Sequence, residues 1–425
     1  MDVDGSRPRK LIGQTGDLFR AVAWSPDNHK LAFVCFRPAL SPTKAELGTY
    51  DFDTGATNSI LYDLGLRAAV AWTRDNRLIY SLTEFGPNST EDSLWAIPVD
   101  PRTSAVRGPA QRLTDGPDPK SLVSVSDSGK MLTYARVSFH AHMYVVRVPR
   151  KGETNEAPTR MNLDEGNNYP FTWTPDGESV IFVSDRGGVR HLYKQSVHQS
   201  SPDLLVGGDE PVVIPRISPD RSEILYSLGP VKQGDPTGIL AIAVNGGSPR
   251  EVLRANDISD FQCARAPANT CIIAQSNTET IQFSMFDPKT GVVKPALTIQ
   301  QGTDLDDSFS PDGTTLAVEL DVSGRIPAKI QLYNVRDASH FTMKVKGWGI
   351  RSGMDWNSDG KSLWVHARTA KGVEAIVNVD LQGNVKPLLE DTENLIGWAV
   401  PSPDGSRIAF YKQSMSSDVW LLRDF

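Results

Sequence analysis

Phe309-Ser310-Pro311-Asp312-Gly313 is one copy of a short motif that recurs along this chain, and Trp173-Thr174-Pro175-Asp176-Gly177 is another. Pro presets φ for a turn, Asp bonds to its own backbone, and Gly accepts a positive φ. An apolar run of strand length, Val180–Val183 after the second copy, follows the motif. The motif therefore predicts a tight turn that joins two strands of a β-hairpin.

The motif occurs at nine places, with one degenerate copy, Ala266-Pro267-Ala268-Asn269, that lacks the acidic residue. Consecutive copies are 44 to 52 residues apart. This spacing is typical of the blades of a β-propeller. The acidic residues that we expect to shape the eight other turns are Asp27, Asp75, Asp127, Asp176, Asp220, Asp312, Asp359 and Asp404.

Each unit contains up to four runs of strand length, and no amphipathic helix interrupts them. We therefore predict an all-β fold, a single β-propeller of four-stranded blades with nine blades, eight being the alternative. We expect residues 1–16 to form the fourth strand that the last blade lacks, which would complete that blade and close the ring. The predicted blades are 17–65, 66–118, 119–166, 167–208, 209–256, 257–302, 303–349, 350–393 and 394–425.

Composition narrows the class of protein. The 425 residues carry 44 basic and 51 acidic side chains, a net charge of −7, and no basic block, so we expect no nucleic-acid partner. No apolar run approaches the ~20 residues of a membrane helix, so we expect no membrane insertion of this segment. The first ten residues, MDVDGSRPRK, lack the apolar region of a signal peptide.

These repeats resemble the TolB-type propeller, whose turns carry an aromatic-Ser-Pro-Asp-Gly motif. The last stretch, Trp398–Gly405 followed by Ser417–Phe425, is similar to the C-terminal propeller of bacterial receptor-like Ser/Thr kinases and winged-helix (CadC-like) regulators. That resemblance implies the sensor part of a membrane-anchored signalling protein, with the propeller outside the cytoplasm. The compartment is otherwise open.

Catalytic motifs are scarce. The G-x-S-x-G elbow of the propeller-bearing serine peptidases is absent. His140-Ala141-His142 places two imidazoles on one strand face, but the other five histidines are scattered. We therefore predict a protein that is not an enzyme and has no bound metal or other cofactor. A metal-dependent lyase or lactonase acting in the channel is the alternative, and so is a divalent cation at Asp304, Asp306 and Asp307.

The first strand of each blade is expected to line the central channel, and aligning these strands on their turns predicts the channel mouth. Mixed charge with two aromatic rings suits a small polar ligand or a peptide end, although solvated strand ends would look the same. The aromatic residues at the turns (Trp24, Trp72, Trp173 and Trp356) are expected in the core between blades. The predicted mouth consists of Arg20, Arg67, Lys120, Tyr169, Asp260, Asp304, Asp306, Arg351 and Trp398.

Cys263 and Cys271 flank the degenerate turn symmetrically, so the hairpin would bring them opposite each other. We predict that they form a disulfide, with two buried thiols as the alternative. In function, we expect a non-catalytic domain that senses a ligand or binds a protein. A periplasmic TolB-like protein-binding scaffold is a further alternative.

Overall fold

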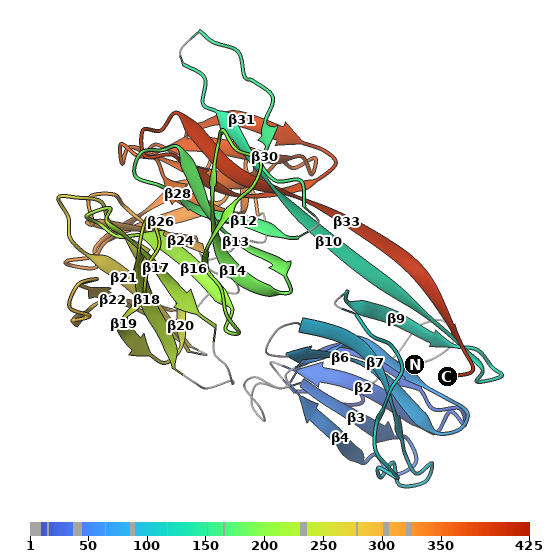
Figure 1. Ribbon diagram of the computed structural model, residues 1–425. Coiled ribbons are helices and arrows are strands. Elements are labelled where there is room, and N and C mark those ends of the chain that lie inside the picture. Colours follow the sequence, from blue (N-terminus) through green and yellow to red (C-terminus); the bar gives the residue numbers. More distant parts are fainter. Residues whose placement is uncertain are drawn as a thin grey trace. The chain divides into compact units, whose positions relative to one another are not determined.

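The computed structural model describes residues 10–14, 17–36, 45–63, 65–85, 90–116, 118–150, 152–164, 166–229, 236–277, 279–300, 306–319 and 325–425. Every helix or strand element in these ranges is a β-strand, and most strands belong to four-stranded sheets (Figure 1). The predicted all-β class is confirmed. In the same ranges no helix is long and apolar enough to cross a membrane.

The chain divides into two compact units. The first, which we call the N-terminal unit, comprises Met1–Phe139 and Met415–Phe425, and the second, the ring unit, comprises His140–Ser414. Two strands of 17 residues, β10 (Met131–Arg147) and β33 (Arg407–Arg423), contribute residues to both units and are neighbours in one sheet (Figure 1).

The N-terminal unit contains two four-stranded sheets and the strand β9 (Lys120–Val125), which pairs with the first half of β10. Its largest core lies between the two sheets, where Val34 and Leu47 pack against Leu66, Val70 and Leu78. The sheets consist of β1 (Leu18–Trp24), β2 (Lys30–Phe36), β3 (Ala45–Asp51) and β4 (Thr57–Asp63), and of β5 (Leu66–Trp72), β6 (Arg77–Phe85), β7 (Thr90–Pro98) and β8 (Gln111–Arg112).

The ring unit contains five four-stranded sheets in which consecutive strands pair as a meander. Their strands are β12 (Asn168–Trp173), β13 (Ser179–Gly187), β14 (Val189–Ser196) and β15 (Asp203–Val206); β16 (Val212–Ile217), β17 (Glu223–Leu228), β18 (Thr237–Ala243) and β19 (Arg250–Ala255); β20 (Ile258–Cys263), β21 (Cys271–Ser276), β22 (Thr280–Phe286) and β23 (Val293–Gln300); β24 (Asp306–Phe309), β25 (Thr315–Glu319), β26 (Lys329–Asn334) and β27 (His340–Lys344); β28 (Gly349–Trp356), β29 (Ser362–Arg368), β30 (Glu374–Asp380) and β31 (Val385–Asp391).

A sixth sheet completes the ring unit. Its order is β32 (Leu395–Pro401), β33, β10 and β11 (Thr159–Arg160). The first strands of neighbouring sheets contact one another in the order β12, β16, β20, β24, β28 and β32, and β32 contacts β12 again. Six sheets of the described chain therefore close a ring around one axis, which is the arrangement of a β-propeller.

The ring of the described chain has six sheets, so the expected count of nine blades in one ring is not confirmed. Strands β9, β10 and β11 of the expected blade 119–166 join β32 and β33 in one sheet, and β11 supplies its closing strand. Residues 1–9, 15 and 16 lie outside the described residues, and 10–14 form no strand. The physical reason is visible at 136–140 (Arg-Val-Ser-Phe-His), which lacks the Gly, Pro, Asn or Asp of a turn, so β10 continues through it.

Six of the eight expected aspartates form the hydrogen bonds that the motif predicts. At Asp127 the hydroxyls of Ser126 and Ser128 form the turn's bonds, and at Asp75 the Thr73 hydroxyl donates to the carboxylate. Ser310 Oγ donates to Asp312 Oδ1 at 2.6 Å, and the Thr314 backbone N–H donates to the same atom at 3.0 Å. Equivalent pairs of bonds occur at Asp27, Asp176, Asp220, Asp359 and Asp404. At the last of these, the Ser402 hydroxyl and the Ser406 backbone N–H lower the pKa of the carboxyl to about 2.

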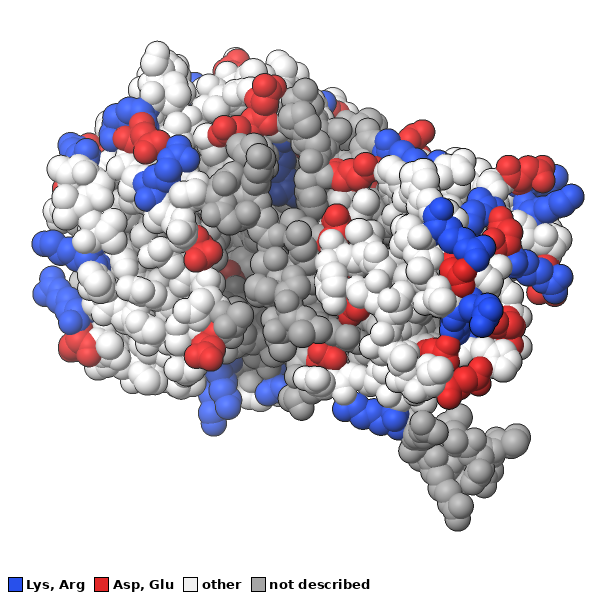
Figure 2. Space-filling view, turned by 90° about the horizontal axis from the view of Figure 1, so that it is seen from below, with Lys and Arg blue, Asp and Glu red and all other residues white. Residues whose placement is uncertain are grey.

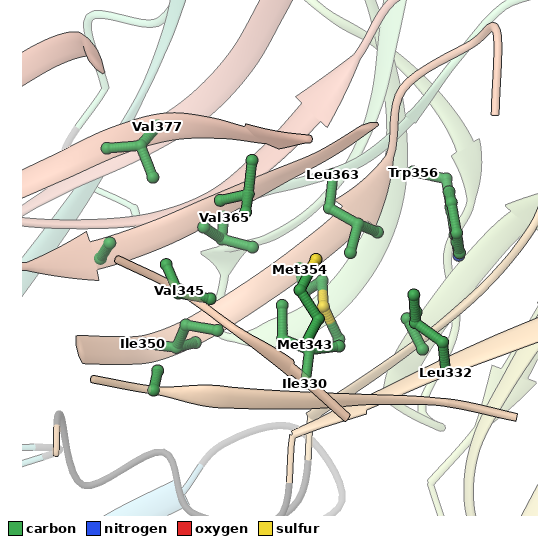
Figure 3. Packing of buried hydrophobic residues seen from close by; sticks show 14 of the residues in the cluster. Ile330, Leu332, Met343, Val345, Ile350, Met354, Trp356, Leu363, Val365 and Val377 are labelled. Atoms are coloured by element: carbon green, nitrogen blue, oxygen red, sulfur yellow. The ribbon is translucent and has the colours of Figure 1, made fainter. Parts of the chain in front are cut away.

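Apolar side chains fill the spaces between neighbouring sheets. Figure 3 shows one such core, in which Ile330 and Leu332 of β26 and Met343 of β27 pack near Leu363 and Val365 of β29. Trp356 lies at its edge, and its indole Nε1–H donates to the Ser308 carbonyl at 2.9 Å. Trp173 donates in the same way to the Val400 carbonyl at 3.0 Å.

Three of the four turn tryptophans are buried as expected, namely Trp72, Trp173 and Trp356. Trp24 is the exception, because 56% of its surface is exposed and its ring stacks on Phe52 at 5.0 Å between centroids. It lies on β1, where Ala21 and Ala23 pack against the core shared with β5, and residues on the other face of the strand, Trp24 among them, are exposed. The predicted core position of Trp24 is therefore wrong.

Candidate ligand cavity

The six first strands of the ring unit surround a cavity of about 870 Å³. Side chains from β12, β16, β20, β24, β28 and β32 all line it. Ligand pockets typically occupy ~300–1,000 Å³. The cavity is therefore large enough for a small organic molecule or a short stretch of peptide.

One side of the cavity is acidic. It is formed by four aspartates on the three consecutive strands β20, β24 and β28, and we call it the acidic wall. Only one of the four carboxylates forms an ion pair among the described residues, since Asp260 Oδ1 lies 3.4 Å from Nη2 of Arg216 on β16. The members of the acidic wall are Asp260, Asp306, Asp307 and Asp355.

Hydrogen bonds between neighbouring strands hold the acidic wall in place. Gln262 Nε2 donates to Asp307 Oδ2 at 2.9 Å, and Gln262 Oε1 accepts from the Phe309 N–H at 2.7 Å, which ties β20 to β24. The Met354 N–H donates to Asp306 Oδ2 at 2.8 Å, which ties β24 to β28. The carboxylates are thus fixed before any ligand arrives.

Burial changes the protonation of the acidic wall. Burial, reinforced by the nearby Asp260 carboxylate, raises the pKa of Asp306 to about 7, although the Met354 N–H acts in the opposite direction. Burial also raises the pKa of Asp307 well above its ordinary value, with Asp260 and Asp306 adding to the effect. The pKa values of Asp260 and Asp355 are raised by burial too, against the pull of Arg216 and Arg265 respectively.

The opposite side of the cavity is aromatic. It comprises Trp398 of β32 with Tyr169 and Phe171 of β12, and we call it the aromatic wall. The Trp398 ring centroid lies 4.6 Å from that of Phe171 and 5.6 Å from that of Tyr169. In a closed order of six strands, β12 lies across from β24, and β32 lies across from β20. The aromatic wall therefore faces the acidic wall.

Trp398 has an unusual backbone, with a φ of +50°. A large residue seldom adopts this left-handed conformation, and such strain is concentrated at functional sites. Gly353 of β28 allows it, because a β-carbon on this glycine would lie 2.6 Å from the Trp398 Cα. The position of the indole ring thus depends on a glycine in the neighbouring strand.

No family model and no curated protein matches this chain. Among solved structures it is similar to a TolB from Agrobacterium tumefaciens, at 17% identity and a TM-score of 0.50, over 65% of this chain and 99% of that one. A TolB from Acinetobacter baumannii matches at 12% identity and a TM-score of 0.42, over 80% of both chains.

The chain folds as a TolB-type β-propeller. At this level of identity the likeness concerns the fold. The expected similarity to bacterial kinases and CadC-like regulators stays a prediction.

The propeller cavity includes four of the nine residues predicted for the channel mouth: Tyr169, Asp260, Asp306 and Trp398. Arg351 lies on β28 but does not line the cavity, and Asp304 lies outside the described residues. The other three, Arg20, Arg67 and Lys120, belong to β1, β5 and β9 of the N-terminal unit and do not line this cavity.

Lys120 has a structural role in that unit. Its side chain is buried, and Nζ donates to the backbone carbonyls of Gly116 at 3.2 Å and Asp118 at 2.9 Å. Burial lowers the pKa of this ammonium group. Lys120 therefore closes a loop and does not present its charge to a ligand.

Alignment on the turns missed Phe171, Arg216, Gln262 and Asp355 as cavity residues. The first strands contain bulges, between Pro170 and Thr172 in β12 for example, and each bulge shifts which residues face the axis. A signal was nevertheless present, because Arg216 and Asp355 each precede the turn aspartate by four residues.

The other predicted features are less suited to chemistry. The rings of His140 and His142 lie 6.4 Å apart, and no group of three or more His, Cys, Asp or Glu in the described ranges is arranged to hold a metal. Cys263 and Cys271 pair across β20 and β21 and are joined by a disulfide. Cys35 is buried in the N-terminal unit.

On the face shown in Figure 2, acidic and basic side chains of the described residues are interspersed. That face offers no large patch of one sign among them. The cavity is therefore the more specific feature from which to argue a function.

Proposed function

We propose that the ring unit is a non-catalytic binding domain whose cavity takes up a small organic molecule or the end of a peptide. The observation that carries this proposal is the cavity itself, in which a polar wall faces an aromatic wall. Few polar groups among apolar surfaces are the usual composition of a ligand pocket. Cross-strand bonds from Gln262 and Met354 organise the polar wall in advance, which reduces the entropy lost on binding.

The same domain would serve as the sensor of a membrane-anchored signalling protein, the role that the sequence resemblance implies. A rigid ring suits this task, because six strands fix the side chains while the loops are free to vary. A protein partner that docks on the ring without entering the cavity, as a TolB-like scaffold would bind it, is the competing outcome.

A thermal-shift screen of the full chain tests the proposal, using amino acids, short peptides, sugars and cell-wall fragments. A ligand at 100 times its Kd stabilises the folded protein by about 2.7 kcal/mol, which moves the Tm of a domain of this size by several degrees. Calorimetry on each hit then measures its affinity. Failure of every compound would contradict binding of a small ligand and would favour the protein partner.

Variants show whether a compound that raises the Tm binds in the cavity. Trp398→Ala removes one of the three rings of the aromatic wall and should weaken binding, whereas Trp24→Ala, at an exposed tryptophan in the other unit, should leave the affinity unchanged. Phe171→Leu is a milder second variant in case Trp398→Ala fails to fold. A hit that binds equally to all these variants does not use the cavity.

A further inference from the structure

The acidic wall holds four carboxyl groups, and only one of them forms an ion pair among the described residues. Asp260 is paired with Arg216, but neither Asp306 nor Asp307 forms an ion pair with a Lys or Arg in the ranges the structure describes. Asp307 is 6% exposed. Asp307 nevertheless lines the cavity, where its carboxyl group accepts a hydrogen bond from the neutral side-chain amide of Gln262. Two carboxyl groups of the cavity therefore have no Lys or Arg ion-pair partner among the described residues.

The aromatic wall is an independent observation about the same ligand. Tyr169 and Phe171 lie on β12, across from the two carboxyl groups of β24, and Trp398 lies on the adjacent strand β32. Ring faces attract cations, and they also pack against apolar groups. Arg216 already uses this property, because its guanidinium lies 5.4 Å from the centroid of the Phe171 ring. Arg190, Arg221 and Arg265 also line the cavity, so a preference for a cation must arise at the two carboxyl groups and not from the charge of the cavity as a whole.

We infer that the cavity selects a protonated amine carried on an apolar or aromatic body, with the ammonium group at Asp306 and Asp307 and the body against Trp398, Tyr169 and Phe171. An ammonium has three N–H donors, and carboxylates are its strongest acceptors. This inference rests on the proposed function and names the chemical class of its ligand.

Binding of the amine is also coupled to protons. The charged groups that act on Asp306 are Asp260, Asp307 and Asp355 of the acidic wall, and Arg216. The raised pKa of Asp306, about 7, means that this carboxyl holds a proton in mildly acidic solution. Entry of an ammonium requires the ionised form, so affinity for the amine should fall as the pH is lowered through 7.

Three probes with the same phenylethyl body test the inference by calorimetry on the full chain at pH 8 and pH 5.5. They are 2-phenylethylamine, a cation; 2-phenylethanol, a neutral molecule; and 3-phenylpropionate, an anion. At pH 8 the amine should bind about tenfold or more tightly than the alcohol, since hydrogen bonds to charged groups are the stronger ones. The anion should bind more weakly than the amine, and only the amine should weaken at pH 5.5.

Asp306→Asn and Asp307→Asn, singly and together, should bring the affinity for the amine down to that for the alcohol. The alcohol itself should bind the variants as it binds the natural chain. Asp337→Asn is the matched control, because Asp337 lies in an exposed turn of the same unit and does not line the cavity. Unchanged preference for the amine in the double variant would overturn the assignment to these carboxylates.

The outcomes separate this inference from the proposed function. Binding of the alcohol or the anion as tightly as the amine would overturn the inference while leaving the cavity as a ligand site. So would a rise in Tm with millimolar Ca²⁺ together with loss of amine binding, which would assign the carboxylates to a metal. If no probe binds, the inference fails, and the broader screen alone decides the proposed function.

Discussion

The backbone of Trp398 lies so close to Gly353 that no side chain fits between them: a β-carbon on the glycine would be 2.6 Å from both the Cα and the N of Trp398. This contact joins β28 to β32 in the ring and positions the indole ring of the aromatic wall. Gly353 also has a φ of +69°, which favours glycine on its own account.

Replacing Gly353 with Ala should therefore destabilise the ring unit and disturb the aromatic wall. Gly360→Ala is a close control, since its φ is +68° and its added β-carbon would meet only Pro311 Cδ at 3.9 Å. Both variants share the cost of the left-handed backbone, about 1 kcal/mol. Gly353→Ala should lose about 1–3 kcal/mol more in urea unfolding, because the strands must move apart. Equal losses in the two variants would show that the contact is unimportant.

Asp306 should make stability depend on pH. Its native pKa of about 7 exceeds the ordinary value near 3.9, so between these pH values the folded state holds a proton that the unfolded state has lost. The contribution of this group to the free energy of unfolding therefore falls as the pH rises from about 4 to about 7. Asp306→Asn retains an acceptor for the Met354 N–H but removes the titration.

The variant should match the natural chain near pH 4 and be more stable above pH 7. We expect a gain of about 1 kcal/mol or more at pH 8, or roughly 2–4 °C in Tm. Urea unfolding at pH 4.5, 6 and 8 measures the difference. If the free energies of unfolding of the variant and the natural chain differ by the same amount at all three pH values, Asp306 does not titrate with a raised pKa.

Trp173 and Trp356 should stabilise the ring through equivalent hydrogen bonds across neighbouring first strands. Trp173→Phe leaves the Val400 carbonyl without its donor, and Trp356→Phe does the same to the Ser308 carbonyl. Each change should cost about 1 kcal/mol or more, because the hydrogen bond from the buried indole N–H is lost. Trp24→Phe should stay within about 0.5 kcal/mol, since that residue is exposed. Chemical unfolding of the three variants under one condition provides the comparison.

The pairing of Cys263 with Cys271 predicts a simple thiol count. The chain has three cysteines, and the register of β20 and β21 places these two directly opposite each other. Under oxidising conditions, the denatured chain should therefore show one reactive thiol, that of Cys35. Reduction before titration should raise the count to three. Three thiols without reduction would mean that the two sulfur atoms are not bonded.

Much of the local structure was predictable because it depends on residues close in sequence. The Ser-Pro-Asp-Gly turn is an example, since Ser310, Asp312 and Thr314 form its bonds within five residues of one another. The same holds for Cys263 and Cys271, which a short hairpin brings together. Tyr169, Asp260, Asp306 and Trp398 were also found in advance, because a first strand of a blade faces the axis wherever its turn is recognised.

The rest of the cavity depended on details that no local pattern contains. Bulges in β12, β16, β20 and β28 change which of the following residues face the axis. The alignment therefore did not predict that Phe171, Arg216 and Asp355 line the cavity. The pKa of Asp306 likewise depends on burial and on carboxylates far away in the sequence. These effects arise only when six strands meet around one axis.

The sequence by itself determined that this protein is built from repeated four-stranded β-sheets with Asp-containing turns, because turn chemistry and strand alternation act over a few residues. Only the tertiary structure decided how many sheets share a ring. That number depends on the pairing of β10 with β33, two strands that lie more than 200 residues apart along the chain. Backbone N–H and C=O groups are alike in every strand, so the choice between partners is made by the packing of whole sheets.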